Sequence, residues 1–197
     1  MTRAEPLCNS EESVAWHAHR EAETISDPSV LEELGESLLR EKNKKRRQAV
    51  YFMLGHLGAR VRGSDCARLL LSQASKETDK YVLSSLLEAL QRIPKAAELD
   101  LTPVFELLHD ERWQVRHSAI QALAHSESPE AEDRLLDLLR ATSDPYDITY
   151  CQGILNKIGT AKAIPLLEKN LKSRKRDVKG TAQFAIEAIK RREAAKR

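Results

Sequence analysis

Small and apolar residues recur in the same order five times along this 197-residue chain. Each copy has an anchor position, and further small or apolar residues stand four, seven and eight residues after it. The anchors lie 31 to 36 residues apart, at Arg46, Val82, Val115, Asp147 and Val178. Because these offsets share one side of a helix with 3.6 residues per turn, the pattern predicts five helices with one apolar face each.

A second set of positions predicts a partner helix before each of these five. Twelve residues before the anchors stand four leucines and, in the third copy, a proline: Leu34, Leu70, Pro103, Leu135 and Leu166. One helical hairpin cannot bury its own apolar face, whereas stacked hairpins share a continuous core. The sequence therefore predicts an all-α fold, a right-handed α-solenoid of about five helical hairpins with an N-terminal capping helix.

Turn residues divide the chain into three regions. We expect an N-terminal segment with the capping helix at 1–27, a repeat domain at 28–190 and a basic C-terminal tail at 191–197. The repeats are expected at about 28–60, 64–94, 101–126, 129–159 and 161–190. Capping residues followed by proline predict four helix starts, at Asp27-Pro28, Thr102-Pro103, Ser128-Pro129 and Asp144-Pro145. Gly58 and Gly159 are predicted to end their helices in the left-handed conformation.

Two stretches of the chain resemble a known repeat family. Residues 163–167 followed by 177–182, and residues 110–123, are similar to HEAT repeats, especially the short HEAT-like type of phycobilisome lyase proteins. The resemblance covers roughly residues 28–190, although Arg46 and Asp147 stand where valine is expected. It implies a helical solenoid, a fold that serves many functions. Relatives implied by the resemblance include bilin lyases, alkylpurine DNA glycosylases and toxin-neutralising immunity proteins.

The face of each second helix opposite its apolar stripe is expected to line the concave surface of the solenoid. Positions two and six after the anchors, together with the central tryptophan, supply the candidate protein-binding residues Gln48, Phe52, Ser84, Glu88, Trp113, His117, Gln121 and Thr149. This mixed, nearly neutral chemistry suits a protein partner better than a phosphate backbone. Trp113 is interpreted either as a binding anchor or as a structural side chain between turns.

Basic residues gather at the turns inside the first and fifth repeats and beside Trp113. The candidate anion- or nucleic-acid-binding residues are Lys44, Lys45, Arg46, Arg47, Arg112, Arg116, Lys172, Arg174, Lys175, Arg176 and Lys179. Since turns of one kind fall on one edge of a solenoid, these residues predict two basic poles that bind a nucleic acid or an acidic protein. The alternative is that they only keep the turns solvated.

The motifs of catalytic and metal sites are not found in this sequence. No glycine-rich phosphate loop, nucleophile elbow or paired-carboxylate motif occurs, and His109, His117 and His125 lack partners at ligand spacing. We therefore expect no enzyme activity, cofactor or metal. No apolar run is long enough to cross a bilayer, and the odd number of cysteines, three, favours the reducing cytoplasm.

The function predicted from the sequence is that of a non-catalytic scaffold or adaptor that binds a protein through its concave helix face and its basic turns. The alternative, from another class, is a nucleic-acid-binding protein that uses the two basic poles and Trp113. A toxin-immunity protein is a lesser alternative, which follows from the family resemblance alone.

Overall fold

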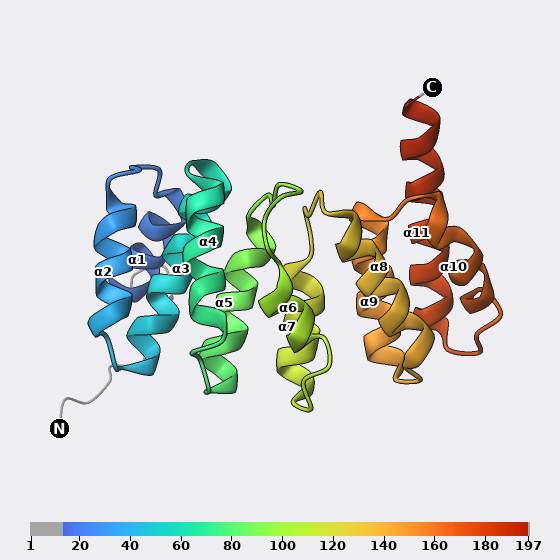
Figure 1. Ribbon diagram of the computed structural model, residues 1–197, viewed down its shortest axis with the longest axis horizontal. Coiled ribbons are helices and arrows are strands. Elements are labelled where there is room, and N and C mark those ends of the chain that lie inside the picture. Colours follow the sequence, from blue (N-terminus) through green and yellow to red (C-terminus); the bar gives the residue numbers. More distant parts are fainter. Residues whose placement is uncertain (1–13, 197) are drawn as a thin grey trace.

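The computed structural model describes residues 14–196, which form a single row of stacked helices (Figure 1). The helices are α1 (Val14–Thr24), α2 (Val30–Arg40), α3 (Lys44–Arg60), α4 (Gly63–Ala74), α5 (Lys80–Arg92), α6 (Thr102–Leu107), α7 (Trp113–Ala122), α8 (Pro129–Ala141), α9 (Pro145–Ile158), the short 3-10 helix η2 (Ala161–Ala163), α10 (Ile164–Asn170) and α11 (Arg176–Ala195). Within 14–196, the only β pairing is an isolated bridge between Lys95 and Ser126. The prediction of an all-α solenoid is confirmed. Residues 1–13, part of the predicted N-terminal segment, lie outside the described residues.

The helices pack in five consecutive pairs, α2 with α3, α4 with α5, α6 with α7, α8 with α9 and α10 with α11. The second helices, α3, α5, α7, α9 and α11, also contact one another in chain order and form a continuous layer, which we call the second-helix face. Helix α1 packs on α3 at the start of the stack. No helix within residues 14–196 has the length and apolar character needed to span a membrane.

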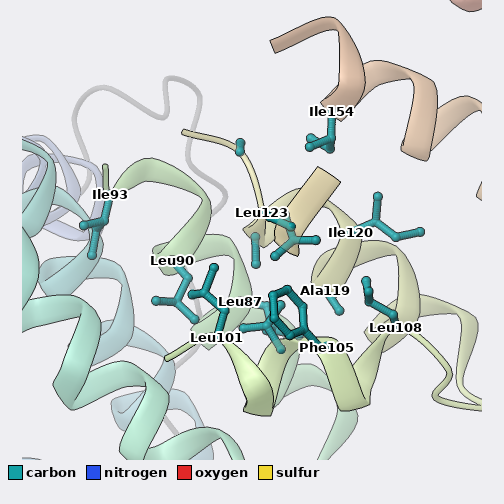
Figure 2. Packing of buried hydrophobic residues seen from close by; sticks show 14 of the residues in the cluster. Leu87, Leu90, Ile93, Leu101, Phe105, Leu108, Ala119, Ile120, Leu123 and Ile154 are labelled. Atoms are coloured by element: carbon teal, nitrogen blue, oxygen red, sulfur yellow. The ribbon is translucent and has the colours of Figure 1, made fainter. Parts of the chain in front are cut away.

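Leucine and alanine make up most of the core, and many of them stand at the repeating offsets. In α5, for example, Val82, Leu86, Ala89 and Leu90 are all buried. Figure 2 shows how buried residues of the second and third pairs, with Ile154 from α9, form one continuous cluster. Burial of a leucine side chain contributes about 1.5–3 kcal/mol, so hairpins that share this core stabilise one another.

Gly55, Gly58 and Gly159 permit close packing, and the prediction that Gly58 and Gly159 adopt a left-handed conformation is wrong. Helix α3 continues through Gly58, where a Cβ atom would lie only 2.6 Å from Cδ1 of Ile93. A Cβ atom on Gly55 would lie 2.8 Å from Cα of Ala89 in α5. No glycine within 14–196 has a positive φ angle, and Gly159 is extended, with φ −64° and ψ 150°. These positions need a missing side chain rather than an unusual backbone.

The predicted helix starts are only partly confirmed. Asp144 caps α9 as predicted, since its side chain accepts a hydrogen bond of 2.8 Å from the Tyr146 N–H. At the first predicted start, Asp27 accepts the same kind of bond from the Ser29 N–H, at 2.9 Å, and the regular helix α2 begins at Val30, two residues after Pro28. At α6, the Asp100 side chain accepts from the Thr102 N–H at 2.9 Å, so Thr102 is not the capping residue.

A buried lysine closes the end of α5. Lys95 is 1% exposed, and its Nζ atom donates to the carbonyl oxygens of Leu90 at 2.7 Å and Ile93 at 2.6 Å. Its backbone also pairs with the turn after α7, through the carbonyl of His125 and the N–H of Glu127, both at 2.9 Å. Burial, assisted by the charge of Lys157, lowers the pKa of Lys95 to about 7. This residue thus links the second pair of helices to the third.

Candidate functional site

Three of the predicted binding residues line a hollow of about 530 Å³ between α1, α3 and α5. They are Gln48, Phe52 and Glu88. The Phe52 ring lies 4.2 Å from the His19 ring and 4.4 Å from the His56 ring, measured between centroids, and the Arg92 guanidinium lies 5.9 Å from its centre. Phe52 therefore packs partly against the first helix while still facing the hollow.

A second hollow, of about 310 Å³, lies between α5, α7 and α9. It is lined by Gln121 and Thr149, as well as by the ring of Tyr150. Ser84 is half-buried on α5, and its Oγ atom is buried without a hydrogen-bond partner among the described residues. The second-helix face thus carries two separate hollows that include five of the predicted residues.

His117 belongs to the interior of the junction between α7 and α9. It is 7% exposed, its ring stacks on that of Tyr150 with 4.4 Å between centroids, and its Nε2 atom lies 2.9 Å from Asp147 Oδ1. Asp147, 4% exposed, also binds Arg116 Nε at 2.9 and 3.0 Å and Thr142 Oγ1 at 3.1 Å. We therefore leave His117 out of the surface available to a partner.

The unusual aspartate at the fourth anchor thus has a structural role. Asp147 replaces an apolar contact by hydrogen bonds that link the third helical pair to the fourth. Helices α7 and α9 contact one another less extensively than α3 with α5, α5 with α7, or α9 with α11. Figure 1 shows the same separation between α6–α7 and α8–α9. Polar and aromatic side chains, among them Arg116, His117 and Tyr150, take part in this junction.

Three exposed aromatic side chains form a row at the starts of successive second helices. Tyr81 is 61% exposed in the first turn of α5, Trp113 is 57% exposed in the first turn of α7, and Tyr146 is 68% exposed in the first turn of α9. We call these three residues the aromatic row. Sequence reasoning identified Trp113 but missed both tyrosines, which stand directly before the anchors Val82 and Asp147.

The basic residues of the first turn have carboxylate partners, mostly from the next repeat. Lys44 Nζ lies 2.7 Å from Asp79 Oδ2, and this hydrogen bond lowers the pKa of Asp79. Arg47 Nε donates to Glu77 at 2.8 Å, and its guanidinium also donates to the carbonyl oxygens of Leu38 and Glu41. These side chains connect the repeats to one another.

The other two basic residues of the first turn differ in their partners. Arg46 lies 3.6 Å from the carboxylate of Glu41. Lys45 is exposed and forms no ion pair with any described residue. Most of the predicted first pole is therefore neutralised by carboxylates.

The two central arginines are also paired. Arg112 binds Asp110 with 2.7 Å between Nη2 and Oδ2, and this hydrogen bonding lowers the pKa of Asp110. Its Nη1 atom donates to the carbonyl of Thr78 at 2.9 Å, across the boundary between repeats. Arg116, besides binding Asp147, donates to the Asp110 carbonyl at 2.9 Å.

The fifth turn is different, since its cations are exposed and unpaired. No ion pair within 14–196 involves any of the five basic residues at this turn. We call them the fifth-turn cluster: Lys172, Arg174, Lys175, Arg176 and Lys179. Among the predicted basic residues in 14–196, the unpaired cations are therefore gathered mainly at the fifth turn, at one end of the stack, rather than equally at the first and fifth turns.

The described residues hold no group of three or more His, Cys, Asp or Glu side chains that could bind a metal ion. Cys66 and Cys151 are buried free thiols, and burial raises the pKa of each. The candidate functional features among the described residues are two hollows on the second-helix face, the aromatic row and the fifth-turn cluster.

Comparison with known proteins agrees with this architecture. An engineered protein of known crystal structure is 19% identical, with 89% of this chain and 88% of that chain covered and a TM-score of 0.53, a likeness that concerns the fold alone. The smu.31 protein of Streptococcus mutans UA159 is 18% identical over 86% of this chain and 90% of its own, with a TM-score of 0.43. No curated protein sequence matches. The family model for HEAT repeats matches residues 67–152 and 101–187, and the chain therefore belongs to the HEAT-repeat family.

Proposed function

We propose that this protein is a non-catalytic scaffold that binds another protein through the aromatic row and the adjoining second-helix face. The observation that carries the proposal is the exposure of Tyr81, Trp113 and Tyr146, each more than half accessible to solvent. Large rings with a polar atom are the side chains that dominate protein interfaces. The three stand in the first turns of successive second helices, one or two residues before the anchors, and such grouping favours an interaction surface over scattered apolar residues.

The charges around the row support a protein partner rather than a nucleic acid. Carboxylates of Asp79, Asp110 and Asp144 cap or precede the same helix starts that carry the aromatic rings. The nearby cations Lys44, Arg112 and Arg116 are already engaged with carboxylates. A nucleic acid needs several cations free to replace the counterions of its phosphates, and this stretch offers few.

The proposal is tested by affinity purification from the cells that make the protein, with quantitative mass spectrometry of the proteins recovered. The test variant combines Tyr81→Ala, Trp113→Ala and Tyr146→Ala. The control variant is Leu39→Ala, since this side chain, 77% exposed, lies on α2, outside the row and the second-helix face. Circular dichroism and thermal unfolding establish that both variants keep the native helices.

We expect at least one protein that is abundant with the wild-type chain and the control variant to fall at least about tenfold with the test variant, as truncation of interface hot spots predicts. Equal recovery of every protein with all three chains would contradict the proposal. The nucleic-acid alternative would be favoured by a different result: RNA or DNA co-purifies with the wild-type chain, and nuclease treatment removes both the nucleic acid and all co-purified proteins.

A further inference from the structure

The aromatic row leads directly into the fifth-turn cluster. A hollow of about 230 Å³ lies between the first turns of α9 and α11. It is lined by Tyr146, Pro145 and Thr149 on one side and by Lys175, Arg176, Asp177 and Val178 on the other. A chain lying along the row and passing Tyr146 therefore meets the side chains of Lys175 and Arg176 next.

The balance of charge changes sharply at this point. Along the row, cations and carboxylates alternate and pair, as Lys44 does with Asp79 and Arg112 with Asp110. Beyond Tyr146 stand the five unpaired cations of the fifth-turn cluster, with Asp177 as the one carboxylate among the residues that line the hollow. Unpaired surface cations in one place attract negative charge and specify where an acidic group binds.

The spacing of the row sets the form of a matching ligand. Packed helices lie about 8–10 Å apart, so we expect neighbouring aromatic rings, carried at the starts of packed helices, to lie about one helix spacing apart. An extended peptide advances about 3.3 Å per residue, so every third side chain of such a peptide meets the next ring. A nucleic acid carries a negative charge on every nucleotide, which does not match a neutral row followed by a cationic end.

We propose that the partner presents an extended segment in which apolar side chains recur at every third residue and contact the aromatic row, with a run of acidic residues at one end that binds the fifth-turn cluster. This inference rests on the proposed function and adds the chemistry and the alignment of the partner. It assigns Lys175 and Arg176, beside Tyr146, as the residues that fix the position of the segment along the stack.

The proposal is tested with fluorescein-labelled synthetic peptides and the full-length chain. Two composite peptides share a Ser/Gln stretch in which every third residue is leucine, with three leucines in all. In one peptide four glutamates follow this stretch, and in the other they precede it, so that both directions of the segment are tested. Comparison probes are the leucine stretch alone, the glutamate run alone and a single-stranded oligonucleotide of equal charge. Fluorescence anisotropy gives each dissociation constant at about 50 and 500 mM salt, conditions that differ strongly in screening.

We expect one of the two composite peptides to bind at least about tenfold more tightly than either half or the oligonucleotide, and to weaken as salt rises. The variant Lys175→Glu/Arg176→Glu should lose about tenfold in affinity for it. The matched control Lys190→Glu/Arg191→Glu changes the net charge of the same helix equally but lies at its other end, so it should bind within about twofold of wild type. The Tyr81→Ala/Trp113→Ala/Tyr146→Ala variant should also lose binding.

Three results would overturn this inference. They are failure of both composite peptides to bind, equal effects of the two charge-reversal variants, and tighter binding of the oligonucleotide than of either peptide. The proposed function fails separately, because it requires only that the aromatic-row variant lose its cellular partner. If that partner is lost with the aromatic-row variant and kept with Lys175→Glu/Arg176→Glu, the scaffold function stands and the acidic segment is refuted.

Discussion

Replacing Asp147 by asparagine tests whether hydrogen bonds to a buried carboxylate hold the third and fourth helical pairs together. The substitution keeps the size of the side chain and removes its charge. The Arg116 and His117 contacts, at 2.9 Å, then lose a charged acceptor in a place where only 4% of Asp147 is exposed.

The expected magnitude follows from the partners that remain. Breaking a buried ion pair on one side costs about 3–5 kcal/mol. Arg116 keeps its bond to the Asp110 carbonyl and stands 3.8 Å from Asp144, which reduces the loss. We therefore expect Asp147→Asn to lower the free energy of unfolding by about 2–3 kcal/mol. For a chain of this length, that corresponds to a fall in Tm of about 5–10 °C.

Urea denaturation followed by far-ultraviolet circular dichroism measures this change. The control is Asp137→Asn, because Asp137 is exposed and pairs with Arg140 within one turn of α8, so its loss should cost less than about 0.5 kcal/mol. Equal midpoints for the two variants would refute the argument that Asp147 holds the junction. The double variant Arg116→Met/Asp147→Val should recover at least half of the loss, because it removes both charges together.

Three further predictions concern the interior of the stack. Gly55→Ala should lower the free energy of unfolding by about 1–3 kcal/mol, because the new Cβ would meet α5. Gly153→Ala should raise it by up to about 1 kcal/mol, because no atom lies within 4 Å of the new Cβ. Equal urea midpoints for the two variants would contradict this prediction. The pKa of Lys95 is lowered to about 7, so the unfolded chain binds more protons above that pH. The free energy of unfolding of the wild-type chain, minus that of Lys95→Met, should therefore rise between pH 7 and about 10 by up to about 1.4 kcal/mol per pH unit. Urea denaturation of both chains at each pH measures this difference, and a difference that stays constant with pH would refute the prediction. Cys66 and Cys151 should react with a thiol reagent only after unfolding. The third cysteine, Cys8, lies outside the described residues, so reaction of more than one thiol per chain in native buffer would contradict the burial of Cys66 and Cys151.

Regular positions of the repeat could be predicted from the sequence because burial repeats with the helical period. Val82, Leu86 and Leu90 are buried as their spacing predicts. The same reasoning failed at the glycines. Gly55 and Gly58 are required by the close approach of another helix, a property of the packing that spacing along the chain does not contain.

The candidate surfaces were harder to predict because they depend on contacts between neighbouring repeats. The sequence of the first basic turn, considered without its neighbours, predicts a cluster of unpaired cations. In the folded chain, the next turn lies beside it, and Lys44 meets Asp79, about one repeat further along. The repeat length was therefore the available signal for this pairing. Tyr81 and Tyr146 could have been found in the same way, by comparing the residue directly before each anchor.

Contact between α7 and α9 is less extensive than between the other neighbouring second helices, so a change of angle at this junction would move the last two helical pairs relative to the first three. Tyr81 and Trp113 belong to the first three pairs, and Tyr146 belongs to the last two. A ligand that contacts all three rings would span the α7–α9 junction, so its affinity would depend on the angle between the helices on the two sides of that junction. Changes at Asp147 would then tune ligand affinity from inside the molecule, without any contact with the ligand.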